Sequence, residues 1–361
     1  MSAAMPEPIA ALAPEWAQLA AETGASPFDD PGWATTWWSA FGTGQLEIHK
    51  VRDSSLRALL PMRAAWGGLH SLTNWHSHTS GLLARDEAAI VDLVASLVEG
   101  RPHQVSIGFL ESDAWQTDAL ARAVRERNYR VVFRPLTTPP FVDVEGTFAE
   151  YTARLSRNLR GNLRRRQRML ASSGAAVFEV HDGAQRLDEL LDEGFAVEGS
   201  GWKVAAGSAI LSRPETERFY RGVARWAAAR GQLRLDFLRL DGRCIAFELN
   251  VQSSDTLYDI KGGYDQAFAH LSPGLLLQES AVRRAFDLGL RRVDFLGNTE
   301  RYKMSWATGT RQTVTLMAFA PTPTGRSRWL VERHARPLAK RVKGLLRSRS
   351  HGGESDSDEA G

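Results

Sequence analysis

The stretch from residue 233 to residue 296 constrains the fold more than any other part of the chain. Its strand-like runs are residues 233–240, 244–251, 257–262 and 292–296, and a helical pattern covers residues 274–288. Asp241-Gly242, between the first two runs, is a strong signal for a two-residue hairpin. Hairpin strands are antiparallel, whereas a helix between two strands brings the chain back to the same sheet. We therefore expect a mixed, mostly antiparallel sheet flanked by helices.

The helix in this stretch begins with a sequence that suits phosphate binding. Ser272 is a favoured N-cap residue, and Pro273 suits the first helical position, whose amide would be unpaired anyway. Gly274 lets a ligand approach the backbone closely. The free amides and positive dipole end of a helix start attract phosphate groups. Taken alone, the same residues more often mark an ordinary helix start than a phosphate site.

The rest of the chain is organised around this unit. Residues 9–144 alternate helical and strand-like patterns and contain no motif that indicates a function. Thr147 with Glu150 and Ser212 with Glu215 have capping-box spacing, which predicts the starts of two further helices. A strand is expected at residues 141–144 at the end of the first half, and another at residues 313–319 at the end of the second. The predicted units are residues 1–145, 146–320 and 321–361.

Composition places the chain among globular proteins. Apolar residues make up 43% and charged residues 24%, and no apolar run approaches the roughly 18 residues that a membrane-spanning helix needs. Cys244 is the single cysteine, which excludes an internal disulfide and fits a reducing compartment. The first thirty residues lack the basic start and apolar core of a secretory signal. These features predict a cytoplasmic location.

Two basic segments indicate possible anionic partners. Seven arginines lie between Arg154 and Arg168, and residues 151–178 contain no acid. This face is either solvated or holds a nucleotide phosphate, an acidic polysaccharide or RNA. The aromatic residues expected of a single-strand binder are absent, which argues against RNA. Residues 326–349 carry nine basic residues against Glu332 alone and read as a basic amphipathic helix, for which peripheral membrane contact is a hypothesis.

Two other segments could form a site but also have a simpler structural explanation. His76 and His78 would face one side of a strand, but no third metal ligand has suitable spacing, so a polar loop lining a cleft is favoured and no metal is predicted. The Gly-rich segment 198–203 is either a binding loop or a connector. Gly-x-Ser-x-Gly and Gly-x-Gly-x-x-Gly are absent, which argues against serine-hydrolase and dinucleotide-binding folds.

The motifs taken together resemble one family. They are Lys261-Gly262-Gly263-Tyr264-Asp265, Ser272-Pro273-Gly274, Val293-Asp294-Phe295-Leu296-Gly297, Tyr302-Lys303 with Trp306, and the Arg-rich helix that includes Ser156-Arg157-Asn158-Leu159-Arg160. This set resembles the GNAT acyltransferases associated with cellulose and exopolysaccharide biosynthesis. It is also similar to the Fem peptidyltransferases, which use tandem GNAT domains. The resemblance is clear over residues 151–319 and weak over residues 33–133. It implies an α/β (α+β) chain of tandem GNAT-like domains, the N-terminal one degenerate.

The resemblance also implies roles for individual residues. The strands at 257–262 and 292–296 would splay apart, so that the pantetheine arm of acetyl-CoA pairs with the first. The implied catalytic residues are Lys261, Tyr302, Glu248 and Asp259. Glu248 or Asp259 would take the proton of the acceptor, and Tyr302 would protonate the thiolate. A backbone amide near Lys261 would stabilise the oxyanion. Cofactor contacts would come from Ile260, Gly262, Ser272, Gly274, Leu275, Leu276 and Asn298. Acceptor contacts would come from Trp202, Lys203, Tyr264, Asp265 and Lys303. The usual Gln/Arg-x-x-Gly-x-Gly/Ala phosphate loop is absent.

The predicted function is transfer of an acyl group, most simply acetyl from acetyl-CoA, to a small-molecule or glycan acceptor in the cleft between the two halves. No DNA partner is expected, and no metal is required. One alternative is a Fem-type transferase that uses aminoacyl-tRNA, although the sequence contains no long heptad insertion. The other is a binding protein that kept the fold and lost the chemistry.

Overall fold

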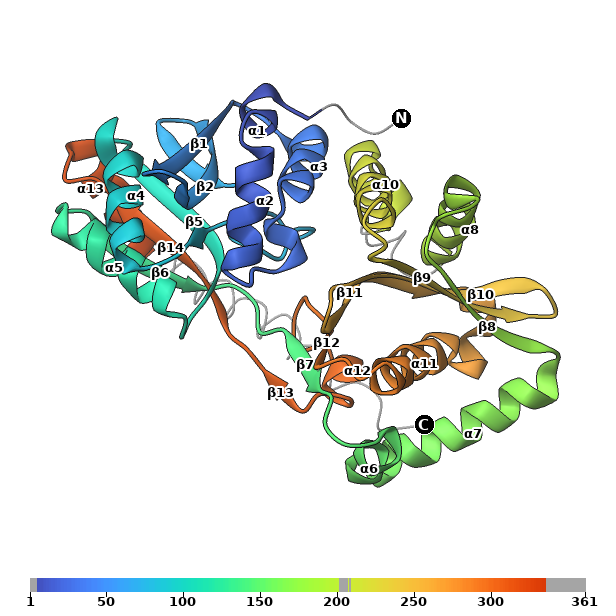
Figure 1. Ribbon diagram of the computed structural model, residues 1–361. Coiled ribbons are helices and arrows are strands. Elements are labelled where there is room, and N and C mark those ends of the chain that lie inside the picture. Colours follow the sequence, from blue (N-terminus) through green and yellow to red (C-terminus); the bar gives the residue numbers. More distant parts are fainter. Residues whose placement is uncertain (1–4, 201–206, 208, 336–361) are drawn as a thin grey trace, which may run out of the picture.

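The computed structural model describes residues 5–200, 207 and 209–335. Two seven-stranded sheets lie side by side, each with helices packed against it (Figure 1). We refer to the sheet near the N-terminus as sheet A and to the other as sheet B. Both are mixed and mostly antiparallel, which confirms the predicted fold class. Every helix in residues 5–200 and 209–335 is too short or too polar to cross a bilayer.

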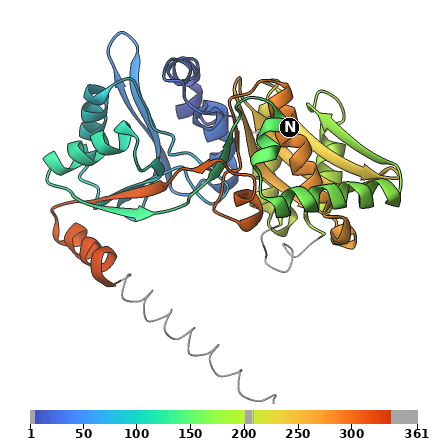
Figure 2. The same cartoon turned by 90° about the horizontal axis from the view of Figure 1, so that it is seen from below.

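Sheet A has the strand order β1-β2-β3-β5-β14-β6, and β4 pairs with β2 outside this path. Its strands are β1 (Gln45–Arg52), β2 (Leu56–Ala65), β3 (Gly68–Ser71), β4 (Leu83–Ala84), β5 (Gln104–Glu111), β6 (Arg130–Pro135) and β14 (Thr313–Phe319). The helices of this half are α1 (Glu7–Ala10), α2 (Ala13–Glu22), α3 (Pro31–Phe41), α4 (Glu87–Glu99) and α5 (Trp115–Glu126). At the chain end, α13 (Pro323–Leu330) and the π-helical turn η4 (Val331–Ala335) pack beside this half (Figure 2).

Sheet B has the strand order β13-β7-β12-β11-β10-β9-β8. Its strands are β7 (Pro140–Asp143), β8 (Ala176–His181), β9 (Leu233–Leu240), β10 (Arg243–Gln252), β11 (Thr256–Tyr264), β12 (Arg292–Asp294) and β13 (Gly309–Thr310). The helices are α6 (Phe148–Arg154), α7 (Arg157–Ser173), α8 (Leu187–Glu198), α10 (Pro214–Ala228), α11 (Pro273–Asp287) and α12 (Arg301–Met304), with short 3-10 turns at Pro27–Asp29, Ile210–Ser212 and Gln266–Leu271. In Figure 1, α8 and α10 cover one face of this sheet, and α11 covers the other.

Two strands lie in the opposite sheet from the one predicted. The strand expected to close the first half, β7, pairs with β12 and β13 in sheet B. The strand expected to end the second half, β14, lies between β5 and β6 in sheet A. The chain therefore crosses between the halves twice. The boundaries at 145 and 320 follow the sequence pattern and do not separate the two sheets.

Local signals were confirmed where the neighbouring residues alone decide the conformation. Asp241 and Gly242 both have positive φ, as the predicted tight hairpin between β9 and β10 requires. Thr147 and Glu150 form both bonds of a capping box at the start of α6. The second predicted capping box is wrong, because α10 begins at Pro214 with Arg213 at the N-cap and no side-chain cap.

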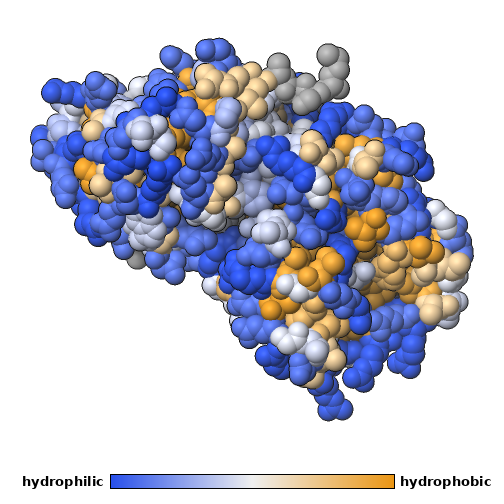
Figure 3. All heavy atoms as spheres, viewed as in Figure 1, coloured by the Kyte–Doolittle hydropathy of each residue, from blue (hydrophilic) through white to orange (hydrophobic). Residues whose placement is uncertain are grey.

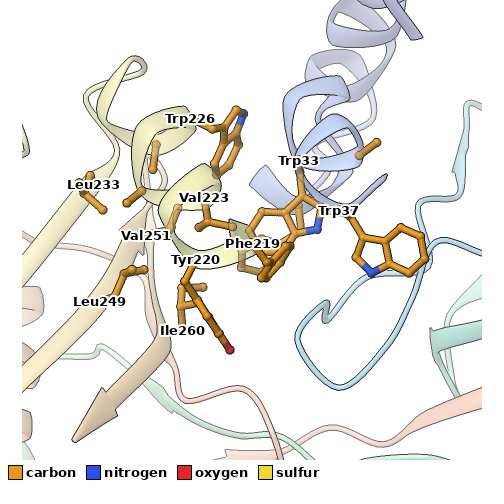
Figure 4. Close-up of a cluster of buried hydrophobic side chains, with 14 of the residues drawn as sticks. Trp33, Trp37, Phe219, Tyr220, Val223, Trp226, Leu233, Leu249, Val251 and Ile260 are labelled. Carbon is orange, nitrogen blue, oxygen red and sulfur yellow. The ribbon is translucent and has the colours of Figure 1, made fainter. Parts of the chain in front are cut away.

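A shared hydrophobic core joins the two halves. Trp33 of α3 packs against Phe219 and Trp226 of α10, with ring centroids 5.4 and 5.7 Å apart (Figure 4). A Cβ added at Gly222 of α10 would come within 2.7 Å of Thr36 of α3, so the two helix backbones approach closely. The same cluster continues into sheet B through Phe237 and its neighbours. This packing sets the position of the N-terminal half against the face of sheet B.

Candidate active site

The centre of sheet B contains a split between two parallel strands. β11 and β12 pair only over three residues each, from Thr256–Arg292 to Tyr258–Asp294. β12 ends at Asp294, whereas β11 continues for six residues to Tyr264. Along those six residues, no strand of the described chain pairs with β11 on the β12 side. The strands therefore diverge at the place where the sequence predicted a splay.

A β-bulge occupies the diverging part of β11. Asn250 pairs with Asp259 and Leu249 with Lys261, so Ile260 is an extra residue in β11. Regular alternation would place Asp259 and Lys261 on the same face of the sheet. The bulge inverts this alternation, and Lys261 instead faces α8. The predicted site residues of β11 are therefore divided between the two faces of sheet B.

Carboxylates gather on the face covered by α11. Glu248 of β10 lies opposite Asp236 of β9 and Gly262 of β11. A Cβ at Gly262 would come within 2.8 Å of Glu248, so the glycine makes room for this side chain. Burial, followed by the negative charges of Asp259 and Asp236, raises the pKa of Glu248 well above its usual value. A carboxyl group whose pKa is raised in this way is suited to act as a general base.

The charge of Asp236 is compensated by an arginine. Arg284 of α11 forms an ion pair with Asp236, and Nη2 lies 2.9 Å from Oδ2. The side-chain amide of Asn250 donates to the same oxygen over 2.8 Å. These contacts fix Asp236 as a structural anion beneath the site. The buried proton-exchanging group of this face is therefore Glu248.

Tyr302 completes the group on this face. It lies in α12, beyond the end of β12, and 54% of its surface is exposed. Its pKa is raised by desolvation of the hydroxyl and then by the charges of Asp259, Glu300 and Glu248. Tyr302 is thus close enough to both predicted bases for their charges to raise its pKa. Its hydroxyl stays protonated and can act as an acid. The structure brings together three of the four predicted catalytic side chains.

Lys261 belongs to a different cluster, on the face towards the N-terminal half. Its Nζ lies 3.4 Å from Oε1 of the buried Glu198, the last residue of α8, and 5.8 Å from the ring centre of Tyr220. The Tyr220 hydroxyl lies 3.1 Å from Nδ1 of His76. Burial, then the charges of Lys261 and Arg213, lowers the pKa of His76 to about 4, so this imidazole is neutral. Lys261 therefore lies on the opposite face of sheet B from the carboxylates, and its catalytic role stays a prediction.

Sequence reasoning missed Glu198 and Tyr220 as members of this cluster. A signal for Glu198 does exist: it follows Phe195 by three residues and Leu191 by seven, which places a carboxylate on the buried stripe of α8. A charge at such a position needs a partner. Nothing in the local sequence identifies Lys261, 63 positions further on, as that partner.

The start of α11 lies beyond the splayed end of β11. Ser272 occupies the N-cap position in a left-handed conformation, with φ of 54°, and its side chain makes no capping bond, contrary to prediction. The amides of Leu275 and Leu276 both donate to the Ser272 carbonyl, over 3.1 and 3.3 Å. Within the described chain, the Gly274 amide has no protein acceptor. A Cβ on Gly274 would lie 3.2 Å from the ring of Tyr264.

Several predicted ligand contacts are engaged within the protein. Lys303 is buried and donates to the Leu296 carbonyl over 3.3 Å, and Glu300 lies 3.2 Å from its ammonium. Asn298 accepts a bond from the Thr138 amide over 3.2 Å. These contacts hold the turn after β12 against the segment that leads into β7.

Two further predicted acceptor contacts also have internal partners. Asp265 caps the turn before α11 through the Ala267 amide and pairs with Arg243 at 2.5 Å. The Tyr264 carbonyl accepts from the Ser200 hydroxyl over 3.3 Å. The remaining two predicted contacts, Trp202 and Lys203, lie outside the described residues.

A polar cavity of about 380 Å³ lies between the two halves. Residues from both halves line it, including Asp29, His78, Tyr258, Asp294 and Arg311. Tyr258 and Asp294 form the last pair before β11 and β12 diverge, so the cavity reaches the apex of the splay from the N-terminal side. Of the predicted polar loop at residues 74–78, His78 lines this cleft. Within the described chain, no group of three or more His, Cys, Asp or Glu side chains could hold a metal ion.

The arginine face predicted on the chain also exists. The predicted single helix is broken at Leu155, whose backbone is extended, so α6 and α7 are separate helices. Along them, the following arginines are exposed and form no ion pair in the described structure: Arg154, Arg157, Arg164, Arg165 and Arg168. Figure 3 shows the hydrophilic edge that these helices form. Arg166 reaches across and donates to the His270 carbonyl, just before α11.

Comparison with known proteins finds a family match within the second half of the chain. Residues 157–304 match the family described as an acetyltransferase (GNAT) domain. This range contains the splay, α11 and the carboxylates. The match confirms the resemblance to GNAT acetyltransferases, whereas the association with cellulose and exopolysaccharide biosynthesis stays a prediction. A search of curated protein sequences found no match.

Solved structures resemble the chain over nearly its whole length. A protein named FemX superposes with a TM-score of 0.57 at 12% identity, covering 84% of this chain and 95% of that one. The C-terminal domain of a putative lysylphosphatidylglycerol synthetase from Agrobacterium fabrum has a TM-score of 0.55 at 13% identity, with 90% and 97% covered. L-PGS from Bacillus licheniformis has a TM-score of 0.50 at 13% identity, with 85% and 96% covered. At such identities the likeness concerns the fold alone.

Proposed function

We propose that this protein transfers an acyl group from acyl-CoA, most simply acetyl-CoA, to a polar acceptor held between its two halves. The observation that carries this proposal is the split between β11 and β12, with Glu248 and Tyr302 beside it and the start of α11 beyond it. An extended pantetheine arm would add to β11 as an extra strand where β12 has diverged. Its diphosphate would lie against the start of α11 at Gly274.

The chemistry follows from the two titratable groups. Glu248, whose pKa is raised by burial, takes a proton from the acceptor as the acceptor attacks the thioester carbonyl. A backbone amide of the β11 bulge stabilises the oxyanion that forms. The carbon–sulfur bond then breaks, and Tyr302 gives its proton to the departing thiolate. Solvent restores both groups to their starting protonation states, so no covalent enzyme intermediate is needed.

The N-terminal half contributes the acceptor site. The cavity between the halves ends at Tyr258 and Asp294, where the strands begin to diverge. An acceptor bound there would enter the gap between the diverging strands, where its attacking atom meets the thioester and Glu248 on the α11 side. The polar lining favours a polar acceptor over a fatty one.

One observation favours a second function. The exposed arginines of α6 and α7 and the fold shared with FemX fit a transferase that takes its acyl group from aminoacyl-tRNA. In that case the splay would receive the aminoacyl end of tRNA instead of pantetheine. Residues 5–200 and 209–335 contain no long paired helices of the coiled-coil kind, which places this function second.

Isothermal titration of the full chain with acetyl-CoA tests the proposal. Micromolar binding is expected, and Gly274→Val should abolish it by moving the ring of Tyr264 into the phosphate position. Gly100→Val is the matched control, because a Cβ there meets no atom within 4 Å. If acetyl-CoA gives no heat of binding but aminoacyl-tRNA binds, the second function replaces the first. If neither ligand binds, the protein is a binding protein that has lost the chemistry.

A further inference from the structure

A tight turn at the end of sheet A exposes an isolated tryptophan. Trp66 and Gly67 join β2 to β3, and both have positive φ, at 51° and 68°. This conformation directs the indole outward, and 79% of Trp66 is exposed. The guanidinium of Arg63, on β2, lies 5.5 Å from the centre of the indole. The exposed ring and the cation beside it are both accessible to an external partner.

The chain end is anchored next to this turn. Arg328 of α13 donates from Nη2 to the Trp66 carbonyl over 2.7 Å. On its other side, α13 is held by Trp329, whose ring centre lies 4.3 Å from the guanidinium of Arg130. A Cβ at Gly325 would come within 2.3 Å of the Ala320 carbonyl, so the start of the helix is also tightly packed. The turn and the helix therefore form one rigid surface.

This surface, which we call the Trp66 face, combines apolar and basic groups. Val331 follows Arg328 by three residues and shares its side of the helix. Leu330 and Val331 are 51% and 53% exposed. Next to Trp66 lie the half-buried Arg63 and Arg328, and the exposed arginines of the adjoining segments are Arg101, Arg326 and Arg333.

Few acids offset the charge of the Trp66 face. Glu332 is in an ion pair with Arg134, and Glu47, at the edge of the neighbouring groove, lies 3.4 Å from His49. The sequence that follows directly, residues 336–349, adds six basic residues and no acid. The described part of the Trp66 face therefore carries a net positive charge, and the sequence after it is basic as well.

We propose that the Trp66 face docks on an anionic lipid surface. Tryptophan prefers the membrane–water interface, aliphatic residues beside it can enter the acyl boundary, and arginines attract anionic headgroups. A nucleic acid would use the arginines but would gain little from Leu330 and Val331, and the face has no series of aromatic rings for base stacking. In Figures 1 and 2, α13 lies at the end of the molecule remote from sheet B. Docking would therefore leave the candidate active site open to solvent, and this inference does not depend on the proposed function.

Co-sedimentation of the full chain with vesicles tests the proposal. The probe is a mixture of phosphatidylglycerol and phosphatidylcholine, compared with pure phosphatidylcholine. Binding is expected to the anionic vesicles and to fall with added salt. Trp66→Ser should weaken it at least about five-fold, and removing the arginine beside the indole, as in Arg63→Gln, should also weaken it about five-fold. Trp75→Ser is the matched control, because Trp75 is 71% exposed on a different loop.

Three results would overturn the proposal. Equal binding of wild type and of Trp66→Ser would assign any attraction to the basic sequence after residue 335 and not to the Trp66 face. Equal binding to anionic and neutral vesicles would remove the role of charge. Binding to bulk tRNA that competes with vesicles and is unaffected by Trp66→Ser would make this a nucleic-acid surface. Circular dichroism of each variant establishes that the fold is retained.

Discussion

Replacing Lys261 by Met tests whether this lysine stabilises the fold through Glu198. The ammonium and carboxylate are 3.4 Å apart, and the side chains are 16% and 0% exposed. At an effective dielectric constant of about 20, two unit charges at this distance attract by about 5 kcal/mol. Desolvation of both groups offsets much of this attraction, but removal of one partner leaves the other charge buried.

We expect Lys261→Met to lower the free energy of unfolding by about 3–5 kcal/mol. Among the described residues, the Ile210 amide also donates to Glu198 over 2.8 Å, and this neutral donor compensates only part of the loss. The double variant Lys261→Met/Glu198→Gln removes both charges and should be more stable than Lys261→Met by about 1–3 kcal/mol. A catalytic role for Lys261 alone predicts no such recovery.

Equilibrium urea unfolding, followed by far-ultraviolet circular dichroism, measures all three variants. Lys50→Met is the control, because Lys50 is exposed on β1 and its loss should change stability by less than about 0.5 kcal/mol. The reasoning is refuted if Lys261→Met lies within about 1 kcal/mol of wild type, or if the double variant is as unstable as the sum of the two single ones.

Three further outcomes follow from the packing and charges of sheet B. Gly194→Ala would place a Cβ 2.4 Å from the ring of Phe247 and should lower the free energy of unfolding, measured in urea, by about 1–3 kcal/mol. In Gly161→Ala the Cβ has no atom within 4 Å, so this change should raise the free energy of unfolding by about 0.5–1 kcal/mol. Similar values for the two variants would contradict the contact with Phe247. Burial raises the pKa of Cys244 to about 12, so native protein at pH 8 should react with iodoacetamide far more slowly than unfolded protein. Mass spectrometry measures both rates, and equal rates would mean that the thiol of Cys244 is accessible in the native protein. Because the folded state raises the pKa of Glu248 above its ordinary 4.5, wild type should lose stability relative to Glu248→Gln as pH rises above that value, and a constant difference between pH 5 and pH 8 would count against the burial of its charge.

The parts of the fold that the sequence predicted well are those decided by adjacent residues. The Asp241-Gly242 hairpin requires two positive φ values in succession, and these residue types tolerate them. The helix at Pro273 begins where the missing amide of proline does no harm. The family resemblance also located the splay between β11 and β12. This resemblance depends on the order of several motifs along the sequence and not on any single motif.

The failures have a common physical cause, which is competition between distant segments. β7 and β14 are short apolar runs that could pair in either sheet, and only the assembled edges decide between them. The face that Lys261 occupies was inverted by one extra residue in β11, a feature that leaves no trace in the alternation of apolar residues. Lys303 looked like a surface charge or a ligand contact because its acceptor, the Leu296 carbonyl, belongs to the backbone.

The two exchanged strands change how the N-terminal half should be understood. It contains no recognisable motif, yet β14 lies in the interior of its sheet, and the segment between its β6 and α6 supplies β7 to sheet B. A cut at residue 145 would therefore deprive sheet A of an interior strand and leave sheet B without the partner of β12. The packing of Trp33 on α10 and this exchange of strands join the two halves into one folded unit. The cavity that ends at the splay is consequently a fixed feature of the fold, and a site there would be assembled before any ligand binds.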